Sequence, residues 1–212
     1  MQTVSIPSPD SMRSRWAALA AMMASRGPAW GRSCYASGNT WHYDDGGGNW
    51  VDLRWVDDQR AVLVGYDHEY SETYFDAAAE YFECDATDIL AGAPDWWSET
   101  IADYLQRQRD KGEWIGFVYG FENGRWTRVD YSVDDGFRSV GLPCVDHEST
   151  REHIVTMLKI VESGDHEADL AIIDAVLAQG AALDPHTAGA LLQPRELDTA
   201  AAVEAAKLFE HP

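Results

Sequence analysis

The tripeptide Asp-His-Glu occurs three times in the sequence, at residues 67–69, 146–148 and 165–167. An imidazole beside carboxylates can act as a general base near neutral pH, and the same groups can bind a transition-metal ion. The second and third copies stand where helices are expected to begin, and acidic side chains stabilise a helix N-terminus there. The first copy is therefore the stronger candidate for chemistry.

This first copy follows a predicted strand, and further polar residues lie on the neighbouring predicted hairpin. Together these groups suggest a hydrolase, with or without a metal ion. Its catalytic residues would be His42, His68 and Glu69. A metal ion would be bound by His42, Asp44, Asp67 and His68. However, the spacing matches no signature such as His-Glu-x-x-His, and no Gly-x-Ser-x-Gly sequence supplies a nucleophile. We therefore treat the hydrolase as the alternative function and expect no cofactor.

Two other patterns predict structure rather than chemistry. The stretch Asp45-Gly-Gly-Gly-Asn49 lacks the Gly-Lys-Ser/Thr ending of a phosphate-binding loop and lies between alternating segments, so it predicts a hairpin turn. The cysteines Cys34, Cys84 and Cys144 are far apart and form no Cys-x-x-Cys pair. They predict reduced thiols rather than a disulfide framework or a zinc ribbon.

The charge of the chain restricts its partners. Acidic residues number 36 against 16 basic ones, which gives a formal net charge of −20. Binding to nucleic acid or to an anionic membrane needs clustered Lys and Arg, so neither is expected. No apolar run approaches the roughly 18 residues that span a bilayer, and no clear signal-peptide cleavage site follows Arg13–Ala24, so we expect a cytoplasmic protein.

Tryptophan is unusually frequent, with nine residues. Strand alternation places Trp50 on a polar face, and one of the adjacent pair Trp96-Trp97 should point outward. Exposed tryptophans among acids resemble the anchors and rim of a protein interface. The predicted partner-binding surface comprises Asp44, Asp45, Trp50, Asp52, Asp67, His68, Glu69, Glu72, Trp96 and Trp97.

Two antiparallel meanders should position these residues. Alternation at 40–44, 50–55 and 60–66 predicts the first meander. Closing its second hairpin on Asp57-Asp58 pairs Leu53 with Val62 and Val51 with Val64. The opposite face then carries His42, Asp44, Trp50, Asp52, Arg54 and Leu63. The second meander is predicted from strands at 114–121 and 125–131 around Asn123-Gly124, with a third strand at 137–140.

Helical periodicity surrounds the meanders. An N-terminal helix should run from about Ser8 to Gly27, a helix or loop should cover 70–82, and a middle helix should run from Pro94 to about Lys111. Further helices are predicted at about 149–163, 167–179, 185–192 and 196–209. The expected fold is α+β: an antiparallel sheet built from two three-stranded meanders, with these helices packed on it. Residues 1–148 should form the core and 149–212 a helical segment of the same structural domain.

An acidic domain with exposed aromatics should dock on a basic protein, because its charge accelerates encounter with a cationic surface. The leading hypothesis is therefore a protein-binding module without catalysis. It resembles, as a class, the bacterial immunity proteins and antitoxins that mask a basic toxin. No motif of such a family can be matched in this sequence, so no functional residues are assigned from them. Preference for Arg over Lys, with only three Lys, is typical of a high-GC bacterial source. We expect a monomer or a small homo-oligomer.

Overall fold

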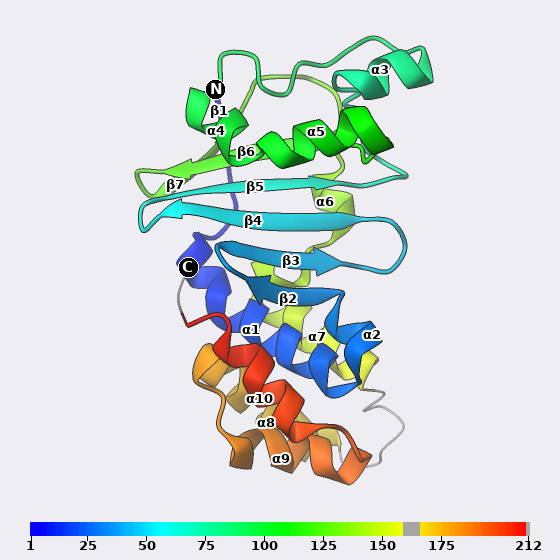
Figure 1. Ribbon diagram of the computed structural model, residues 1–212. Coiled ribbons are helices and arrows are strands. Elements are labelled where there is room, and N and C mark those ends of the chain that lie inside the picture. The colour runs from blue at the N-terminus through cyan, green and yellow to red at the C-terminus, as the bar shows by residue number, and fades with distance from the viewer. Residues whose placement is uncertain (159–165, 211–212) are drawn as a thin grey trace. The chain divides into compact units, whose positions relative to one another are not determined.

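The computed structural model describes residues 1–158 and 166–210 (Figure 1). The chain divides into two compact units. The sheet unit comprises Met1–Ser8 and Tyr43–Leu142, and the helical unit comprises Pro9–His42 and Pro143–Pro212. The strands form one seven-stranded sheet in the order β1-β7-β6-β5-β4-β3-β2, alongside α-helices. The predicted α+β class is therefore confirmed.

The strands of the sheet unit are β1 (Gln2–Val4), β4 (Trp50–Asp57), β5 (Arg60–Tyr66), β6 (Phe117–Glu122) and β7 (Arg125–Arg128). Each pairs antiparallel with its neighbour in the sheet. Strand β2 (Cys34–Ser37) belongs to the helical unit, and the chain passes between units within β3 (Thr40–Asp44). The strands predicted at 40–44, 50–55 and 60–66 are present, whereas the sequence pattern did not predict β2.

The predicted second meander is correct in its hairpin but wrong in its third strand. Asn123 and Gly124 both have positive φ, 53° and 74°, as the tight turn between β6 and β7 requires. Residues 137–140 form a short helix, α6 (Phe137–Val140), instead of a strand. The carboxylates of Asp134 and Asp135 accept the backbone N–H groups of Gly136 and Phe137, which turns the chain there. The third strand is β1, which pairs with β7.

The predicted register between β4 and β5 is wrong by one residue. Leu53 lies opposite Leu63, and Asp52 lies opposite Val64. The register shifts between Trp55 and Asp57, so one extra residue of β4 bulges out. A shift of one residue exchanges the face that each β5 side chain shares with β4. Val62 and Val64 therefore share a face with Arg54 and Asp52, not with Val51 and Leu53.

That mixed face is covered by two helices, α4 (Asp95–Thr100) and α5 (Ala102–Lys111) (Figure 1). The predicted middle helix is thus present but interrupted at Ile101. Val62, Val64 and Val118 of the sheet form one buried cluster with Trp97, Ile101 and Tyr104 of the helical segment. Both faces of β5 are therefore buried, which explains its nearly continuous apolar sequence.

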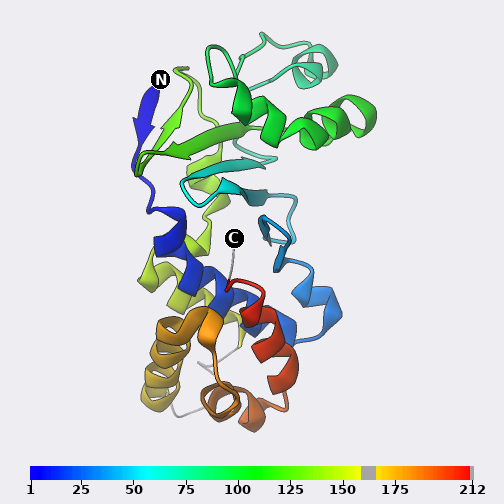
Figure 2. The same cartoon turned by 60° about the vertical axis from the view of Figure 1, so that its left-hand side comes forward.

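The helical unit is built around α1 (Pro9–Ser25) (Figure 2). Residues Trp16 to Met22 of this helix are all fully buried, so α1 is enclosed on every side rather than on one stripe. Its neighbours include α7 (His147–Met157), α8 (His166–Gln179) and α10 (Thr199–Lys207). Among its described residues, the unit also contains α2 (Pro28–Gly31), α9 (Pro185–Leu192) and 3-10 turns at Pro143–Val145, Gly180–Ala182 and Gln193–Arg195.

The C-terminal helices occur close to where periodicity predicts them. The Asp146 carboxylate accepts the Ser149 N–H at 2.7 Å, so the second Asp-His-Glu copy caps α7 as expected. Asp165 of the third copy, the predicted end of the first C-terminal helix and Gly164 lie outside the part that the structure describes, and α8 begins at His166 of that copy. Within the helical unit, α1 packs with the C-terminal helices. No helix in the described residues is long and apolar enough to cross a membrane.

Candidate functional site

Several predicted site residues gather at one end of the sheet unit, where β5 ends. The backbone N–H of His68 donates to the Asn49 amide oxygen at 2.9 Å, which joins the loop after β5 to the turn before β4. The same loop crosses to the segment before α6, because Glu72 N–H donates to the Asp134 carbonyl at 2.8 Å. Two predicted groups, around residues 44–45 and 67–69, are therefore brought close together.

The first Asp-His-Glu copy is built around a buried carboxylate. Asp67 is only 1% exposed, and its Oδ1 accepts the backbone N–H groups of Glu69 and Tyr70 at 2.9 and 2.8 Å. His68 is exposed; its Nδ1 lies 3.0 Å from Asn49 Oδ1 and its Nε2 lies 4.0 Å from Glu69 Oε1. Asp67 thus forms the turn, while His68 and Glu69 face solvent.

The carboxylates of Asp44 and Asp45 shape the glycine-rich turn, as predicted for a hairpin. Asp44 Oδ1 accepts Gly46 N–H at 2.5 Å, and Asp45 Oδ1 accepts Gly47 N–H at 2.6 Å. His42 belongs to the helical unit, where its ring lies 4.8 Å from that of Tyr35. Within residues 1–158 and 166–210, no three His, Cys, Asp or Glu side chains form a group that could hold a metal ion. The hydrolase stays a prediction.

The residues of the predicted partner-binding surface that lie on β4 and α4 are mostly buried or partly buried. The Trp50 ring stacks on that of Tyr104, with 5.5 Å between centroids and 10° between planes. Asp52 is buried and accepts the Tyr104 hydroxyl, and Trp97 is buried under α4. Only Trp96 of the tryptophan pair is partly exposed, as alternation predicts. The exposed members of the predicted surface are Asp45, His68, Glu69 and Glu72.

A prominent exposed aromatic group was missed by the sequence reasoning. Tyr81 and Phe82 end α3 (Ala77–Phe82) and are 71% and 42% exposed. Their rings contact that of Trp114, with centroid separations of 5.3 and 5.6 Å, and Phe82 also lies 5.6 Å from Tyr74. We call Tyr74, Tyr81, Phe82 and Trp114 the aromatic cluster. Exposed aromatics that touch one another are typical of a binding surface.

The segment that contains Tyr74, Tyr81 and Phe82 is acidic. Residues 61–106 contain eleven Asp and Glu but no Lys or Arg, and the whole of 80–86 is exposed. This charge pattern, together with the pairs Tyr74-Phe75 and Tyr81-Phe82, is the signal that could have identified the surface. Like charges in one segment add their fields, so this segment is strongly negative.

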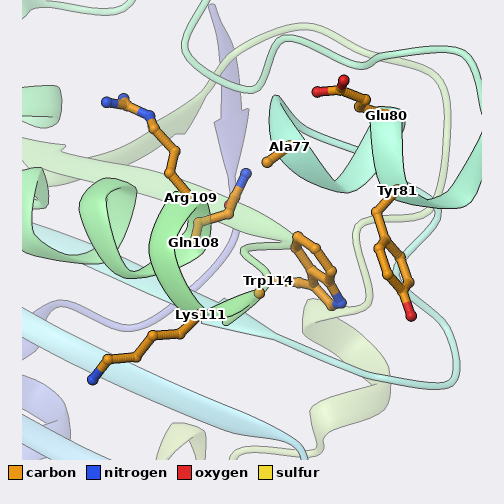
Figure 3. Close-up of a pocket in the computed structure, with 8 residues that line it drawn as sticks. Ala77, Glu80, Tyr81, Gln108, Arg109, Lys111 and Trp114 are labelled. Carbon is orange, nitrogen blue, oxygen red and sulfur yellow. The ribbon is translucent and has the colours of Figure 1, made fainter.

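A cavity of about 620 Å³ opens beside the cluster, between α3 and the C-terminal end of α5 (Figure 3). Its lining residues are Ala77, Glu80, Tyr81, Gln108, Arg109, Lys111, Gly112 and Trp114. Gln108 is held in place because its amide donates to the Phe75 carbonyl at 2.6 Å. In Figure 3 the Tyr81 and Trp114 side chains lie next to each other, whereas Arg109 and Lys111 extend away from them.

The sheet unit also contains a buried polar network. Asp135 Oδ2 accepts the hydroxyl groups of Tyr119 and Tyr131 at 2.6 and 2.8 Å, and Arg128 Nη1 lies 3.8 Å from the same oxygen. Burial, followed by the nearby negative charge of Asp135, raises the pKa of both phenols above their ordinary value. Burial and Asp52 do the same to the pKa of Tyr104. These phenols are hydrogen-bond donors to carboxylates and stay protonated.

In alkali, Tyr104, Tyr119 and Tyr131 should ionise only when the sheet unit unfolds. Because their folded pKa is raised, their contribution to stability is complete below the unfolded pKa of about 10 and is lost as pH rises from there toward the folded pKa. Tyrosinate absorbance and circular dichroism followed together should show one coincident step. Tyr119→Phe should reduce the amplitude of the absorbance change at unfolding and leave the absorbance at lower pH unchanged. A difference in tyrosinate absorbance between the two proteins before unfolding would contradict the assignment.

The described geometry therefore supplies an exposed acidic and aromatic surface with an adjoining cavity and, elsewhere in the sheet unit, a buried polar network. Comparisons of the chain with protein-family models, with curated proteins and with solved structures found no significant match in any of the three.

Proposed function

We propose that this chain is an acidic protein-binding module that docks a basic protein through the aromatic cluster and the acids around it. The observation that carries the proposal is the exposure of Tyr81 and Phe82 within a segment, 61–106, that has no basic residue. Large exposed aromatics supply most of the binding energy in many interfaces, and a surrounding field of one sign steers a partner of the opposite sign.

The class of partner follows from charge. A net charge of −20 favours a protein of high pI, and the module would bind it without catalysis. An immunity or antitoxin-type protein that masks a basic bacterial toxin fits this description. The surface predicted from sequence contributes its exposed acids, among them Glu69 and Glu72, to the same end of the sheet unit. We retain the cytoplasm as the expected compartment, because Cys34, Cys84 and Cys144 are free thiols.

The test compares three immobilised proteins in a lysate of the source organism at low ionic strength. Wild type and Tyr70→Ser, which removes an exposed aromatic outside the cluster, should both retain the same high-pI protein. Tyr81→Ser combined with Phe82→Ser should weaken its binding by at least about thirtyfold, since each interface anchor contributes about 2 kcal/mol. Titration with the purified partner measures the change, and binding should weaken with added salt.

The double variant should keep its fold, because both side chains are exposed. Circular dichroism melting checks this directly. Equal binding by the double variant and wild type, or retention of no basic protein by either, would overturn the proposal.

A further inference from the structure

The cavity beside the aromatic cluster has the chemistry of a receptor for one particular side chain. We infer that it receives an arginine of the basic partner, which would be the anchor of the complex; this inference rests on the proposed function. Three observations lead to it. Aromatic rings border the cavity, hydrogen-bond acceptors lie at its rim, and arginines elsewhere in this chain stack on aromatic rings beside carboxylates.

The chain repeatedly places arginine on aromatic rings. Arg54 and Arg107 lie over Tyr104 with 4.6 and 4.2 Å between guanidinium carbon and ring centroid, and Arg128 lies over Tyr131 at 4.0 Å. Carboxylates complete these sites: Arg54 bonds to Asp103, and Arg107 bonds to Glu113 at 2.7 Å. A planar guanidinium gains from the ring face and from the carboxylate together.

The aromatic cluster has the same ring chemistry without a cation. Among the described residues, no arginine or lysine lies over the rings of Tyr81, Phe82 or Trp114. The two rings at the cavity, Tyr81 and Trp114, belong to different segments and are tilted by 39° to each other. A guanidinium entering from outside would find rings whose faces are free of any cation.

Acceptors stand at the rim of the cavity. Glu80 is exposed and lines it, one helical position before Tyr81. The ten-residue helix α5 ends there at Lys111, and the C-terminal end of a helix carries partial negative charge on its carbonyl groups. Both features favour a cation and suit the several N–H groups of a guanidinium.

The two basic residues of the lining do not block such a cation. Arg109 is paired with Asp76 at 3.3 Å, so its charge is compensated. In Figure 3 both Arg109 and Lys111 project from α5 away from the rings of Tyr81 and Trp114. A volume of about 620 Å³ leaves room for an arginine side chain beside them. Lysine suits the site less well, because its ammonium group is compact and strongly hydrated and does not stack.

The experiment titrates the full chain with Nα-acetyl-arginine amide and follows the tryptophan indole N–H signals by NMR. The Trp114 signal is identified by its loss in Trp114→Phe. Arginine amide should shift this signal to saturation. The citrulline analogue, which keeps the shape but removes the charge, should bind roughly fivefold more weakly, and the lysine analogue should also bind more weakly.

Two variants make the assignment specific. Glu80→Gln should weaken the arginine probe by roughly three- to fivefold, whereas Glu83→Gln, an exposed acid of the same segment that does not line the cavity, should leave its affinity unchanged. Equal binding of the arginine and citrulline analogues, or a response confined to other indoles, would overturn the inference.

The outcomes separate this inference from the proposed function. Capture of a basic protein through Tyr81 and Phe82, with no binding of the arginine probe, overturns the cavity assignment alone. Binding of the probe at Trp114, with no basic protein captured, supports the guanidinium site and overturns the proposed docking function.

Discussion

Gly120→Ala should destabilise the sheet unit by about 3 kcal/mol, the upper part of the range for overpacking a core. A Cβ atom at Gly120 would lie 2.1 Å from Cε2 of the buried Trp97 ring, a separation that no side-chain adjustment of β6 can relieve. The indole would have to leave the surface of the sheet and take α4 with it. Urea unfolding followed by circular dichroism measures the loss.

Two comparisons test the cause of that loss. In a Trp97→Leu background the same glycine substitution should cost much less, because the ring that it strikes is absent; an equal cost in both backgrounds would contradict the packing argument. Gly31→Ala is the matched control. Its Cβ would lie 3.4 Å from Ala24 Cα, an ordinary contact, so the change in stability should stay within about 0.5 kcal/mol.

Asp135→Ala should cost about 3 kcal/mol, because it removes the shared acceptor of a buried network. The hydroxyl groups of Tyr119 and Tyr131 would lose their partner, and Arg128 would lose its counter-charge. Arg128 Nη1 is buried and makes no hydrogen bond of its own. Without the nearby carboxylate, water could not compensate its positive charge. The free energy of unfolding, measured in urea near neutral pH, gives the effect.

The neighbouring acid provides the control for this substitution. Asp134 is exposed and its carboxylate accepts one N–H group, that of Gly136, so Asp134→Ala should cost about 0.5 to 1 kcal/mol. Combining Asp135→Ala with Tyr119→Phe and Tyr131→Phe should recover part of the lost stability, since the unpaired donors are removed as well. An additive loss in the triple variant would exclude the network as the cause.

Local signals in the sequence predicted local structure well. Asn123-Gly124 predicted its hairpin because the turn needs two residues that accept positive φ. The helix predicted at 185–192 is α9, and the structure shows why it begins there: the Asp184 Oδ1 accepts two backbone N–H groups and Pro185 follows. In both cases a few adjacent residues contain all the information that the structure uses.

Pairings between distant residues could not be predicted in the same way. The bulge at Val56 depends on how β4 and β5 meet other strands, and it reverses the expected face of Val62 and Val64. The face with Asp52 seemed polar and solvated, yet α5 supplies Tyr104 to bond that carboxylate. Likewise β1 has only three residues, and it forms because β7 offers an unpaired edge more than a hundred residues later.

The candidate site shows the same limit. His68 and Glu69 are exposed in the loop that follows a strand, where the sequence analysis placed them. Asp67 is buried instead, and its carboxylate accepts two backbone N–H groups of the turn. The aromatic cluster joins α3 to Trp114, which lies over thirty residues further along the chain. Spacing along the sequence does not show such a contact. The absence of Lys and Arg from 61–106 was a signal that could have identified the segment as a binding surface.

The helical unit is assembled from two segments, Pro9–His42 and Pro143–Pro212, which residues of the sheet unit separate along the chain. During synthesis α1 therefore leaves the ribosome long before α7, α8 and α10, the helices that enclose it. Part of its apolar surface lacks those three helices throughout that interval, although Trp16 can already contact Trp41. The nascent chain must tolerate or shield an aggregation-prone helix until translation reaches α10, so folding yield should depend on chaperone supply and elongation rate more than on final stability.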